Sequence, residues 1–474
     1  MDVFANNTEP GVLLKDRDNR DTTAIAHTSK QAASQPLVES KNRTGSHRLA
    51  FAGLFLFTLI LYLRPNDLFF GLLGAFPVAK LVAIFTLLVY AGSKLSQGER
   101  LTIWPIEMKM LAGIVMLGVL HTPFAYWRAG SFALLTDTFL KVAIVFALMI
   151  NLLDTRKRLQ SILKLVVICG TVIALGTITA LGGKAVAEGD RITGLVSGQF
   201  GNPNDLATAL NILLPITVAL ALSRKGRMRI FYFACAAVIT FGVVISFSRA
   251  GFLGLSAMGG VLLWKVGRNN RVVTTLVFLL AAGIFVAALP SGYTDRLFTI
   301  VHTEKDGTGS AQERQQLLAQ AIELAANHVV FGVGMGNFSV YSLHNRAAHN
   351  SYLEISAELG LAGLIAYLTI IFAPLRRLRR IEAQTAFART PEEREMYYLS
   401  IGVQAAIVAY IVCSLFSSIE YYWYLYFPVA YAVSLNRIRE FEMKEEKPSE
   451  GISQPRPDEG LLWDCGQGDA MIAR

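Results

Sequence analysis

The sequence predicts an all-α polytopic membrane protein, with about twelve transmembrane helices and a large external loop between spans nine and ten. The chain of 474 residues is 53% hydrophobic and 17% charged, whereas soluble domains carry roughly a quarter charged residues. Apolar runs of about 17–25 residues, the length that crosses a bilayer, recur along it. Lys and Arg concentrate in alternate connections between these runs, as the positive-inside rule requires of a multi-pass protein.

Twelve apolar runs define the predicted spans. The first is short, and the third and fourth are interrupted by Glu107, Lys109, Asp137 and Lys141. The runs lie at residues 49–63, 69–92, 106–122, 132–153, 159–182, 205–222, 228–246, 249–267, 271–289, 351–374, 399–416 and 419–436.

The distribution of basic residues gives the orientation. With the N-terminus inside, 31 of the 44 Lys and Arg fall in inner segments and only 9 in outer ones, which predicts cytoplasmic N- and C-termini. In a bacterium this topology corresponds to the inner membrane, with loop 290–350 in the periplasm. The net charge of +9 is then explained by the membrane topology and by attraction to anionic headgroups, rather than by binding to nucleic acid.

One membrane domain, 49–436, is expected between two polar cytoplasmic tails. Residues 1–48 and 437–474 are polar enough to be disordered. Gly251, Gly254 and the Gly259-Gly260 pair are expected to let helices approach closely. The four cysteines show neither zinc spacing nor an external disulfide pair; they are Cys169, Cys235 and Cys413 in spans and Cys465 in the tail.

The loop 290–350 contains most of the polar external sequence. Its residues 311–327 place Leu317, Leu318, Ala321, Ile322 and Ala325 at helical spacing, which predicts an amphipathic surface helix. The glycines of the following Phe-Gly-Val-Gly-Met-Gly-Asn-Phe stretch (331–338) predict turns. A nucleotide-binding loop is not favoured there, because no strand precedes it and it lies outside.

Three arginines and one histidine are candidates for chemistry by their position on the outer side: Arg191, Arg249, Arg314 and His349. Guanidinium stays charged and its planar fork matches phosphate oxygens two at a time. Arginines at headgroup depth could therefore bind a diphosphate and stabilise the charge that builds on it as it leaves. An imidazole with a pKa of about 6.5 can accept a proton from an attacking hydroxyl.

Each candidate also has a structural interpretation. Arg249 could be an interfacial anchor, Arg191 a solvated loop residue, and Arg314 the partner of Glu313 on a surface helix. His349 could belong to a helix cap, because Asn350 and the serine after it are favoured at N-caps. The external segments show no Asp/Glu/His cluster with metal spacing, so an enzyme built on these residues is expected to work without a metal or other cofactor.

At these residues the chain resembles the O-antigen ligase and polymerase superfamily, membrane glycosyltransferases that use undecaprenyl-diphosphate-linked glycans. The resemblance covers about 185–370. It rests on Arg191 to Asn204 with its Gly-Asn-Pro-Asn ending, the Ser-Phe-Ser-Arg-Ala-Gly turn (246–251), Arg314 in the loop helix, the glycine-rich turn, and His349-Asn350-Ser-Tyr leading into Glu358-Leu-Gly-Leu-Ala-Gly.

The resemblance implies metal-independent, inverting glycan transfer at the periplasmic face, as in lipopolysaccharide or exopolysaccharide biosynthesis. The residues matching Arg191, Arg249 and Arg314 would bind the diphosphate. His349 would activate the acceptor hydroxyl or position the donor, and Asn204 and Asn350 would support them. The acceptor, whether glycan, lipid or protein, is left open. We expect Arg191, Arg249 and His349 to converge on one outward-open cavity with a lateral opening to lipid.

A secondary transporter or flippase is the alternative function, because twelve spans is common among transporters. Lys80, Lys141 and Glu358 could be midplane charges of such a protein. The absence of a repeat between the two halves and the outer position of the other charges favour the transferase. A scaffold or sensor is less favoured still, because the chain carries no attached signalling domain.

Overall fold

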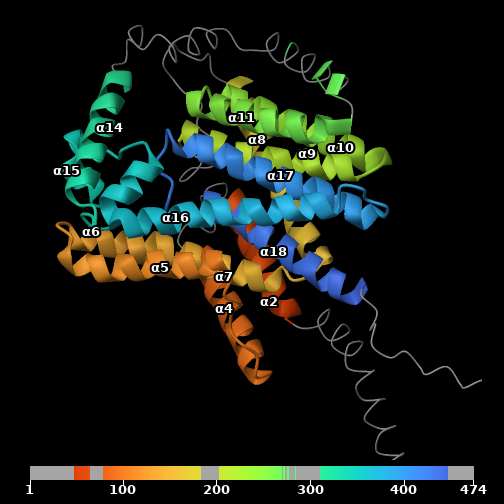
Figure 1. Cartoon of the computed structure of the whole chain (residues 1–474), viewed down its shortest axis with the longest axis horizontal. Coiled ribbons are helices and arrows are strands. Elements are labelled where there is room, and N and C mark those ends of the chain that lie inside the picture. Colours follow the sequence, from red (N-terminus) through yellow and green to blue (C-terminus); the bar gives the residue numbers. More distant parts are fainter. Residues whose placement is uncertain are drawn as a thin grey trace, which may run out of the picture.

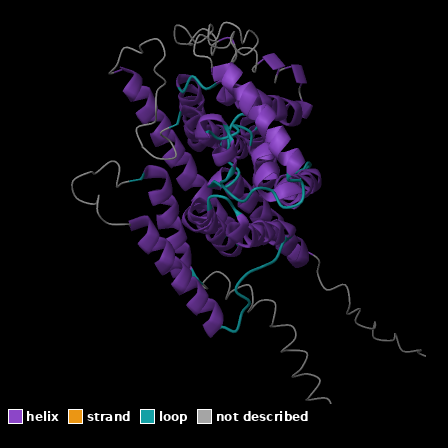
Figure 2. Ribbon diagram, turned by 90° about the vertical axis from the view of Figure 1, so that its left-hand side faces the viewer, coloured by secondary structure: helices purple, strands orange, loops and turns teal. Residues whose placement is uncertain are grey.

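The computed structural model describes residues 47–64, 78–182, 202–269 and 310–446, together with 271, 272, 275, 276 and 283. Every regular element in these residues is a helix, which confirms the predicted all-α class (Figures 1 and 2). The principal helices are α2 (Arg48–Leu63), α4 (Val78–Ser96), α5 (Ile106–His121), α6 (Arg128–Ala133), α7 (Leu140–Leu152), α8 (Arg156–Gly182), α9 (Pro203–Ser223), α10 (Gly226–Ile245), α11 (Arg249–Val266), α14 (Ser310–Asn327), α15 (Phe338–Tyr341), α16 (Ser351–Gln384), α17 (Pro391–Ser414) and α18 (Trp423–Glu446).

Eight helical segments of the described chain are long and apolar enough to cross a membrane. They correspond to predicted spans two to seven, ten and eleven. The helix α2 coincides with the short first span and is a shorter apolar helix, while α11 and α18 overlap spans eight and twelve. Most of span nine (271–289), and most of the two predicted tails, lie outside the described residues. The helix α18 continues to Glu446, ten residues past the predicted end of the membrane domain.

The helix α9 forms the centre of the bundle, surrounded by α8, α10, α11 and α17. It is apolar on all sides, which is the pattern of a fully buried helix, and nearly all of its side chains are buried. Close approach depends on glycine, as predicted for α11. A Cβ on Gly251 would lie 2.6 Å from Ala207 Cβ, and one on Gly254 would lie 2.5 Å from Cys413 Sγ. Gly260 differs, because a Cβ there would meet nothing within 4 Å.

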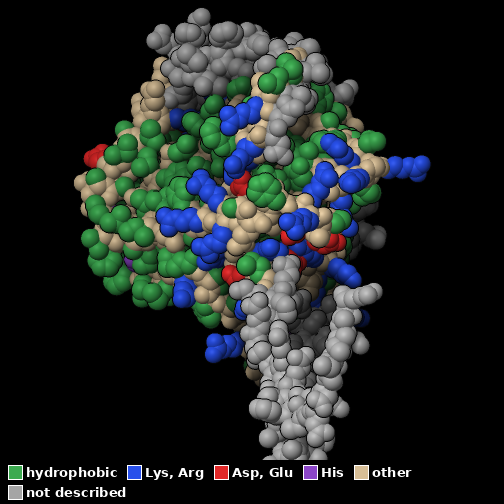
Figure 3. Space-filling model, turned by 45° about the vertical axis from the view of Figure 1, so that its right-hand side comes forward, with side chains coloured by type: hydrophobic (Ala, Val, Ile, Leu, Met, Phe, Trp, Pro, Cys, Tyr) green, Lys and Arg blue, Asp and Glu red, His purple; other side chains and the backbone are tan. Residues whose placement is uncertain are grey.

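The two ends of the bundle have different chemistry. At one end, left in Figure 1 and facing the viewer in Figure 2, the start of α16 lies against α14 and α15. We call this the loop end. The opposite end, called the basic end, gathers the predicted inner segments. Figure 3, turned toward that side, shows many Lys and Arg side chains there. Within the described residues, the segments predicted to be inner and outer are therefore separated in space.

Ion pairs account for the charges that interrupt two predicted spans. Glu107 is fully buried in α5, and its Oε2 lies 2.9 Å from Nη1 of Arg377 on α16. Asp137 and Lys141 are one turn apart and exposed, with 3.5 Å between Oδ1 and Nζ. Because each charge has a partner or reaches the surface, the interrupted runs can still be membrane helices.

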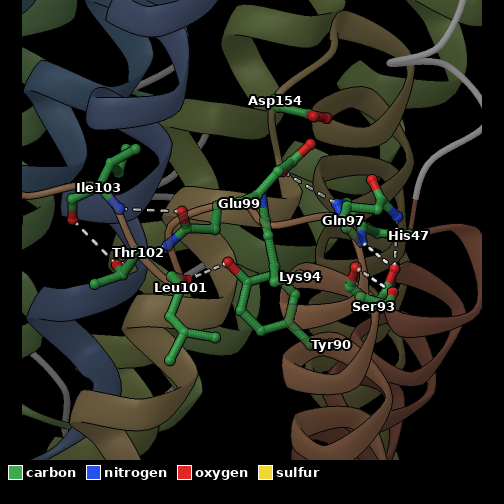
Figure 4. Close-up of polar contacts among 12 residues, drawn as sticks. His47, Tyr90, Ser93, Lys94, Gln97, Glu99, Leu101, Thr102, Ile103 and Asp154 are labelled. Atoms are coloured by element: carbon green, nitrogen blue, oxygen red, sulfur yellow. Dashed lines mark hydrogen bonds and ion pairs between the residues drawn. The ribbon is translucent and has the colours of Figure 1, made fainter.

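A polar cluster attaches the connection between α4 and α5 to the basic end (Figure 4). The Tyr90 hydroxyl donates to the carbonyl oxygen of Leu101, and His47 Nδ1 lies 2.8 Å from Ser93 Oγ. Burial and the nearby Lys94 lower the pKa of His47, and the opposing effect of Glu99 is smaller. The contact between α2 and α4 is therefore made by a neutral imidazole at neutral pH.

We predict that this contact weakens in acid. The folded-state pKa of His47 lies below the unfolded value of about 6.5, so the unfolded state binds more protons as the pH falls. Stability is therefore fully present above about pH 6.5 and decreases below it. Hydrogen exchange, corrected for intrinsic rates, should show α4 less protected at about pH 5.5 than at pH 7.5. The His47→Gln variant should lose this difference and the control His328→Gln should keep it. An equal pH effect in wild type and His47→Gln would contradict the assignment.

Candidate active site

The Asn-Pro-Asn sequence (202–204) and the turn between α10 and α11 meet at the loop end. Asn202 caps α9, its side chain accepting from the backbone N–H of Asn204. The Oδ1 of Asn204 in turn accepts from the Ser248 hydroxyl at 2.7 Å. Ser248 caps α11 by accepting from the N–H of Gly251 at 3.0 Å. Two motifs that lie 44 residues apart are thus joined at one point, which brings Asn204 beside the Arg249 turn.

Arg249 is the first residue of α11 and is half-buried. Helix N-termini carry a partial positive charge and unsatisfied N–H groups, so a cation is unfavourable there unless an anion offsets it. The same features form a ready binding site for phosphate. The turn that sets this position is tight, because Phe247 adopts φ 50 and Ser248 N–H donates to Ser246 Oγ.

The end of α17 connects the Arg249 turn to the His349 turn. The Cys413 thiol approaches the carbonyl oxygen of Ala250, with 3.6 Å between Sγ and O. Two residues further along, the carbonyl oxygen of Leu415 accepts from Asn350 Nδ2 at 3.3 Å. Arg249 and His349, 100 residues apart in sequence, are therefore each next to a residue that contacts α17 or the residue that caps its C-terminus.

His349 lies in a left-handed conformation, with φ 53. For a residue with a side chain such a conformation costs about 1–3 kcal/mol and persists only where its surroundings fix it. Asn350, on one side, caps α16 by accepting from the N–H groups of Tyr352 and Leu353. On the other side, the Ala348 N–H donates to Glu354 Oε2 at 3.0 Å. The predicted helix cap is thus present at Asn350, and it helps to fix the histidine.

Three buried carboxylates lie beneath this turn, and sequence analysis did not place them in the site. Glu354 accepts from Ala348 N–H and the Ser418 hydroxyl. Glu358 accepts from Phe338 N–H at 3.0 Å and from the Tyr421 hydroxyl at 2.8 Å. Glu420 is buried, and its Oε2 has no hydrogen-bond partner among the described residues.

The spacing of two of these residues in the sequence indicates that they lie together. Glu354 and Glu358 are four apart in an otherwise apolar helix, so they share one face. Charges in an apolar helix indicate a functional or structural site, but the sequence alone suggests for Glu358 only a place in the family motif or a midplane charge of a transporter. It lies instead seven residues, or about 10 Å, from the start of α16. Glu420 could not be linked to them from sequence.

The glycine-rich turn packs against a break in α16. Gly360 has φ 66, which interrupts the helix and frees the preceding carbonyl groups. The carbonyl oxygens of Ala357 and Glu358 accept from Val333 N–H and Gly334 N–H, both at 2.9 Å. A Cβ on Gly332 would lie 2.3 Å from the Glu358 carbonyl carbon, so only glycine fits. The positive φ at Gly332, Gly334 and Gly336 confirms the predicted turns.

The surface helix predicted at 311–327 is present as α14, and it covers the start of α16. Its buried side chains include Leu317 and Ala321, whereas Leu318 and Ile322 are exposed. Arg314 is half-buried on the first turns of this helix. Its neighbour Glu313 forms an ion pair with Arg346 at 3.1 Å. Arg191 lies outside the described residues.

These features define a class: a polytopic helical membrane protein with a polar site at one end of its helices. Residues 231–368 match the O-antigen ligase family model. The resemblance to the O-antigen ligase and polymerase superfamily is confirmed by this match, which includes Arg249, Arg314, His349 and Asn350. The match begins after Arg191 and Asn204, so it does not include them. No curated protein matches the chain. In the described residues no group of three His, Cys, Asp or Glu side chains is arranged to hold a metal ion.

We predict that Glu354 fixes the His349 turn. Glu354→Ala leaves the Ala348 N–H unsatisfied, at a cost of about 1–3 kcal/mol, so this amide should exchange roughly 5- to 150-fold faster. Glu354→Gln should retain most of the protection, because its amide oxygen can still accept the bond. The exposed Glu323→Ala on α14 serves as control. Unchanged exchange at 346–350 in Glu354→Ala, measured by mass spectrometry, would rule out this role.

Proposed function

We propose that the protein transfers a glycan from an undecaprenyl-diphosphate-linked donor to an acceptor hydroxyl at the periplasmic face, with inversion and without a metal. The O-antigen ligase domain supports a membrane enzyme of the ligase or polymerase type that acts on a lipid-linked glycan. The observation that carries the finer proposal is the arrangement of the loop end. There Arg249, at a helix N-terminus, and the rigid His349 turn both adjoin residues that contact α17 or the residue that caps its C-terminus.

Arg249 and the N-terminus of α11 are proposed to bind the diphosphate of the donor. Guanidinium can contact two phosphate oxygens at once, and the helix N–H groups add donors with the same preference for anions. As the bond from the sugar to the diphosphate breaks, negative charge grows on the leaving oxygen. The fixed positive charges stabilise that state more than the ground state. Arg191 and Arg314 are proposed as further diphosphate ligands.

His349 is proposed to accept the proton of the acceptor hydroxyl. The hydroxyl oxygen attacks the anomeric carbon on the face opposite the diphosphate, and the new C–O bond forms as the old one breaks. The electron pair of the old bond leaves with the diphosphate, and the hydroxyl proton moves to the neutral imidazole. Because attack is from the opposite face, the anomeric configuration inverts. Asn350 and Glu354 hold the backbone on either side of the histidine.

The topology proposed from charge counting fits this assignment. Twelve spans place loop 290–350 between spans nine and ten in the periplasm, with both termini cytoplasmic in a bacterial inner membrane. The concentration of Lys and Arg at the basic end, opposite the loop end, supports it (Figure 3). The charges that could belong to a transporter have other partners. Lys141 pairs with Asp137 at the helix surface, and Glu358 accepts a hydrogen bond from Phe338 N–H at the loop end.

We predict that replacing Arg249 or His349 abolishes most transfer. Arg249→Ala should lower the rate about 10²- to 10³-fold through lost charge stabilisation, with Arg249→Lys intermediate because lysine has no fork. His349→Ala should lower it about 10²- to 10⁴-fold through lost proton transfer. The matched controls are the exposed Arg227→Ala at the basic end and the exposed His328→Ala on the loop side.

Transfer is measured with purified protein and a synthetic diphosphate-linked donor, and folding is checked by size-exclusion chromatography. Glycans retained on the carrier lipid in cells give a second measure. If both Arg249→Ala and His349→Ala keep full activity, the proposed mechanism is wrong.

A further inference from the structure

A cavity of about 540 Å³ lies at the basic end of α11, far from the candidate active site. The C-terminal half of α11 forms one wall with Gly260, Leu263 and Trp264. The residues that follow contribute Arg268, Arg271 and Thr275. Trp264 is 15 residues from Arg249, or about 22 Å along the helix. The volume of the cavity falls within the range of roughly 300–1,000 Å³ typical of ligand sites, so the cavity can hold a molecule larger than an ion.

The two arginines of this cavity lack the carboxylate partner that several other basic residues at this end have within the described chain. The pairs are Arg156 with Glu442, Arg158 with Asp154, Arg224 with Glu395, Lys265 with Glu382 and Arg377 with Glu107. Arg268 and Arg271 are exposed, and among the described residues neither forms an ion pair. Two uncompensated guanidinium groups at one opening favour an anionic ligand, and their planar forks suit phosphate in particular.

The apolar wall of the cavity indicates that the anion is part of an amphiphile. Trp264 is 77% exposed at this site, and tryptophan is enriched at the membrane interface, where its ring contacts lipid and its N–H reaches the headgroups. Leu263 extends the apolar wall, and Gly260 leaves it open because a Cβ there would meet nothing within 4 Å. A free phosphate ion would gain nothing from such a wall.

We propose that this cavity binds the headgroup of an anionic phospholipid from the surrounding leaflet. Arg268 and Arg271 contact the phosphodiester, the Thr275 hydroxyl adds a donor, and Trp264 and Leu263 contact the glycerol and the first methylenes of the acyl chains. Basic pockets beside membrane helices bind such headgroups by the same combination of charge and apolar contact. The bound lipid fixes the end of α11 opposite Arg249. The proposal is independent of the glycan chemistry.

The test uses the full-length protein in mild detergent and native mass spectrometry. Phosphatidylglycerol and phosphatidylcholine of identical acyl chains are added separately, and inorganic phosphate is added as a competitor. The wild type should retain phosphatidylglycerol at least about tenfold better than phosphatidylcholine, which corresponds to about 1.4 kcal/mol. The double variant Arg268→Gln/Arg271→Gln should lose this preference, and Trp264→Ala should weaken retention of both lipids.

The matched control is Arg376→Gln/Arg379→Gln, which removes two exposed arginines from α16 at the same end without touching the cavity. This control should bind lipid as the wild type does. Equal loss in both double variants would mean that the whole basic rim attracts anionic lipid and no built site exists. Displacement by phosphate at concentrations comparable to the lipid, with no effect of Trp264→Ala, would indicate a free-phosphate site instead. Either result, or unchanged retention in Arg268→Gln/Arg271→Gln, would overturn the proposal.

Wild-type fluorescence provides a second measurement that does not depend on replacing the arginines. Brominated phosphatidylglycerol should quench a component of tryptophan emission that is missing in Trp264→Phe. Brominated phosphatidylcholine should quench this component less. Equal quenching of the Trp264 component by both lipids would contradict the headgroup preference.

Discussion

The break in α16 at Gly360 is the feature on which the candidate site depends. A broken helix exposes carbonyl groups that an apolar environment cannot satisfy, so other parts of the chain must supply donors. The glycine-rich turn supplies them through Val333 and Gly334, and Leu361 N–H returns a bond to Val329. This exchange fixes the turn against α16. Phe338, at the end of this turn, donates its N–H to the Glu358 carboxylate, so the packing of the turn also positions a carboxylate under the His349 turn.

Much of the fold could be predicted from sequence because span length and charge distribution are local properties. The hydrophobic runs predicted most of the helices, and α11 begins at Arg249 as expected. The helix α14 was found from its apolar spacing, although Leu324 rather than Leu318 extends its buried face. The interrupted spans were harder to assign. Glu107 is tolerated in α5 only because Arg377, 270 residues away, reaches it, and local sequence carries no sign of that pairing.

The candidate site was predicted only in part, because its motifs were recognised one by one while their contacts are tertiary. Arg249, Asn204 and Asn350 lie at the loop end as expected, and Asn204 contacts Ser248 directly. The carboxylates were missed because Glu420 lies in the connection after α17, more than 60 residues beyond Glu354 and Glu358. Glycine at 360 was taken as part of an apolar helix. Its positive φ becomes necessary only when Val329 and Val330 approach it.

The electrostatics of the loop end divide the proposed chemistry between two regions. The N-terminus of α11 concentrates positive charge beside Arg249, which favours an anion such as the proposed diphosphate. The carboxyl groups of Glu354, Glu358 and Glu420 are buried beneath the His349 turn. A negative charge on any of these groups would favour the imidazolium that the proposed proton transfer to His349 forms. Charge separation of this kind suits a reaction in which an anion leaves on one side and a proton is accepted on the other.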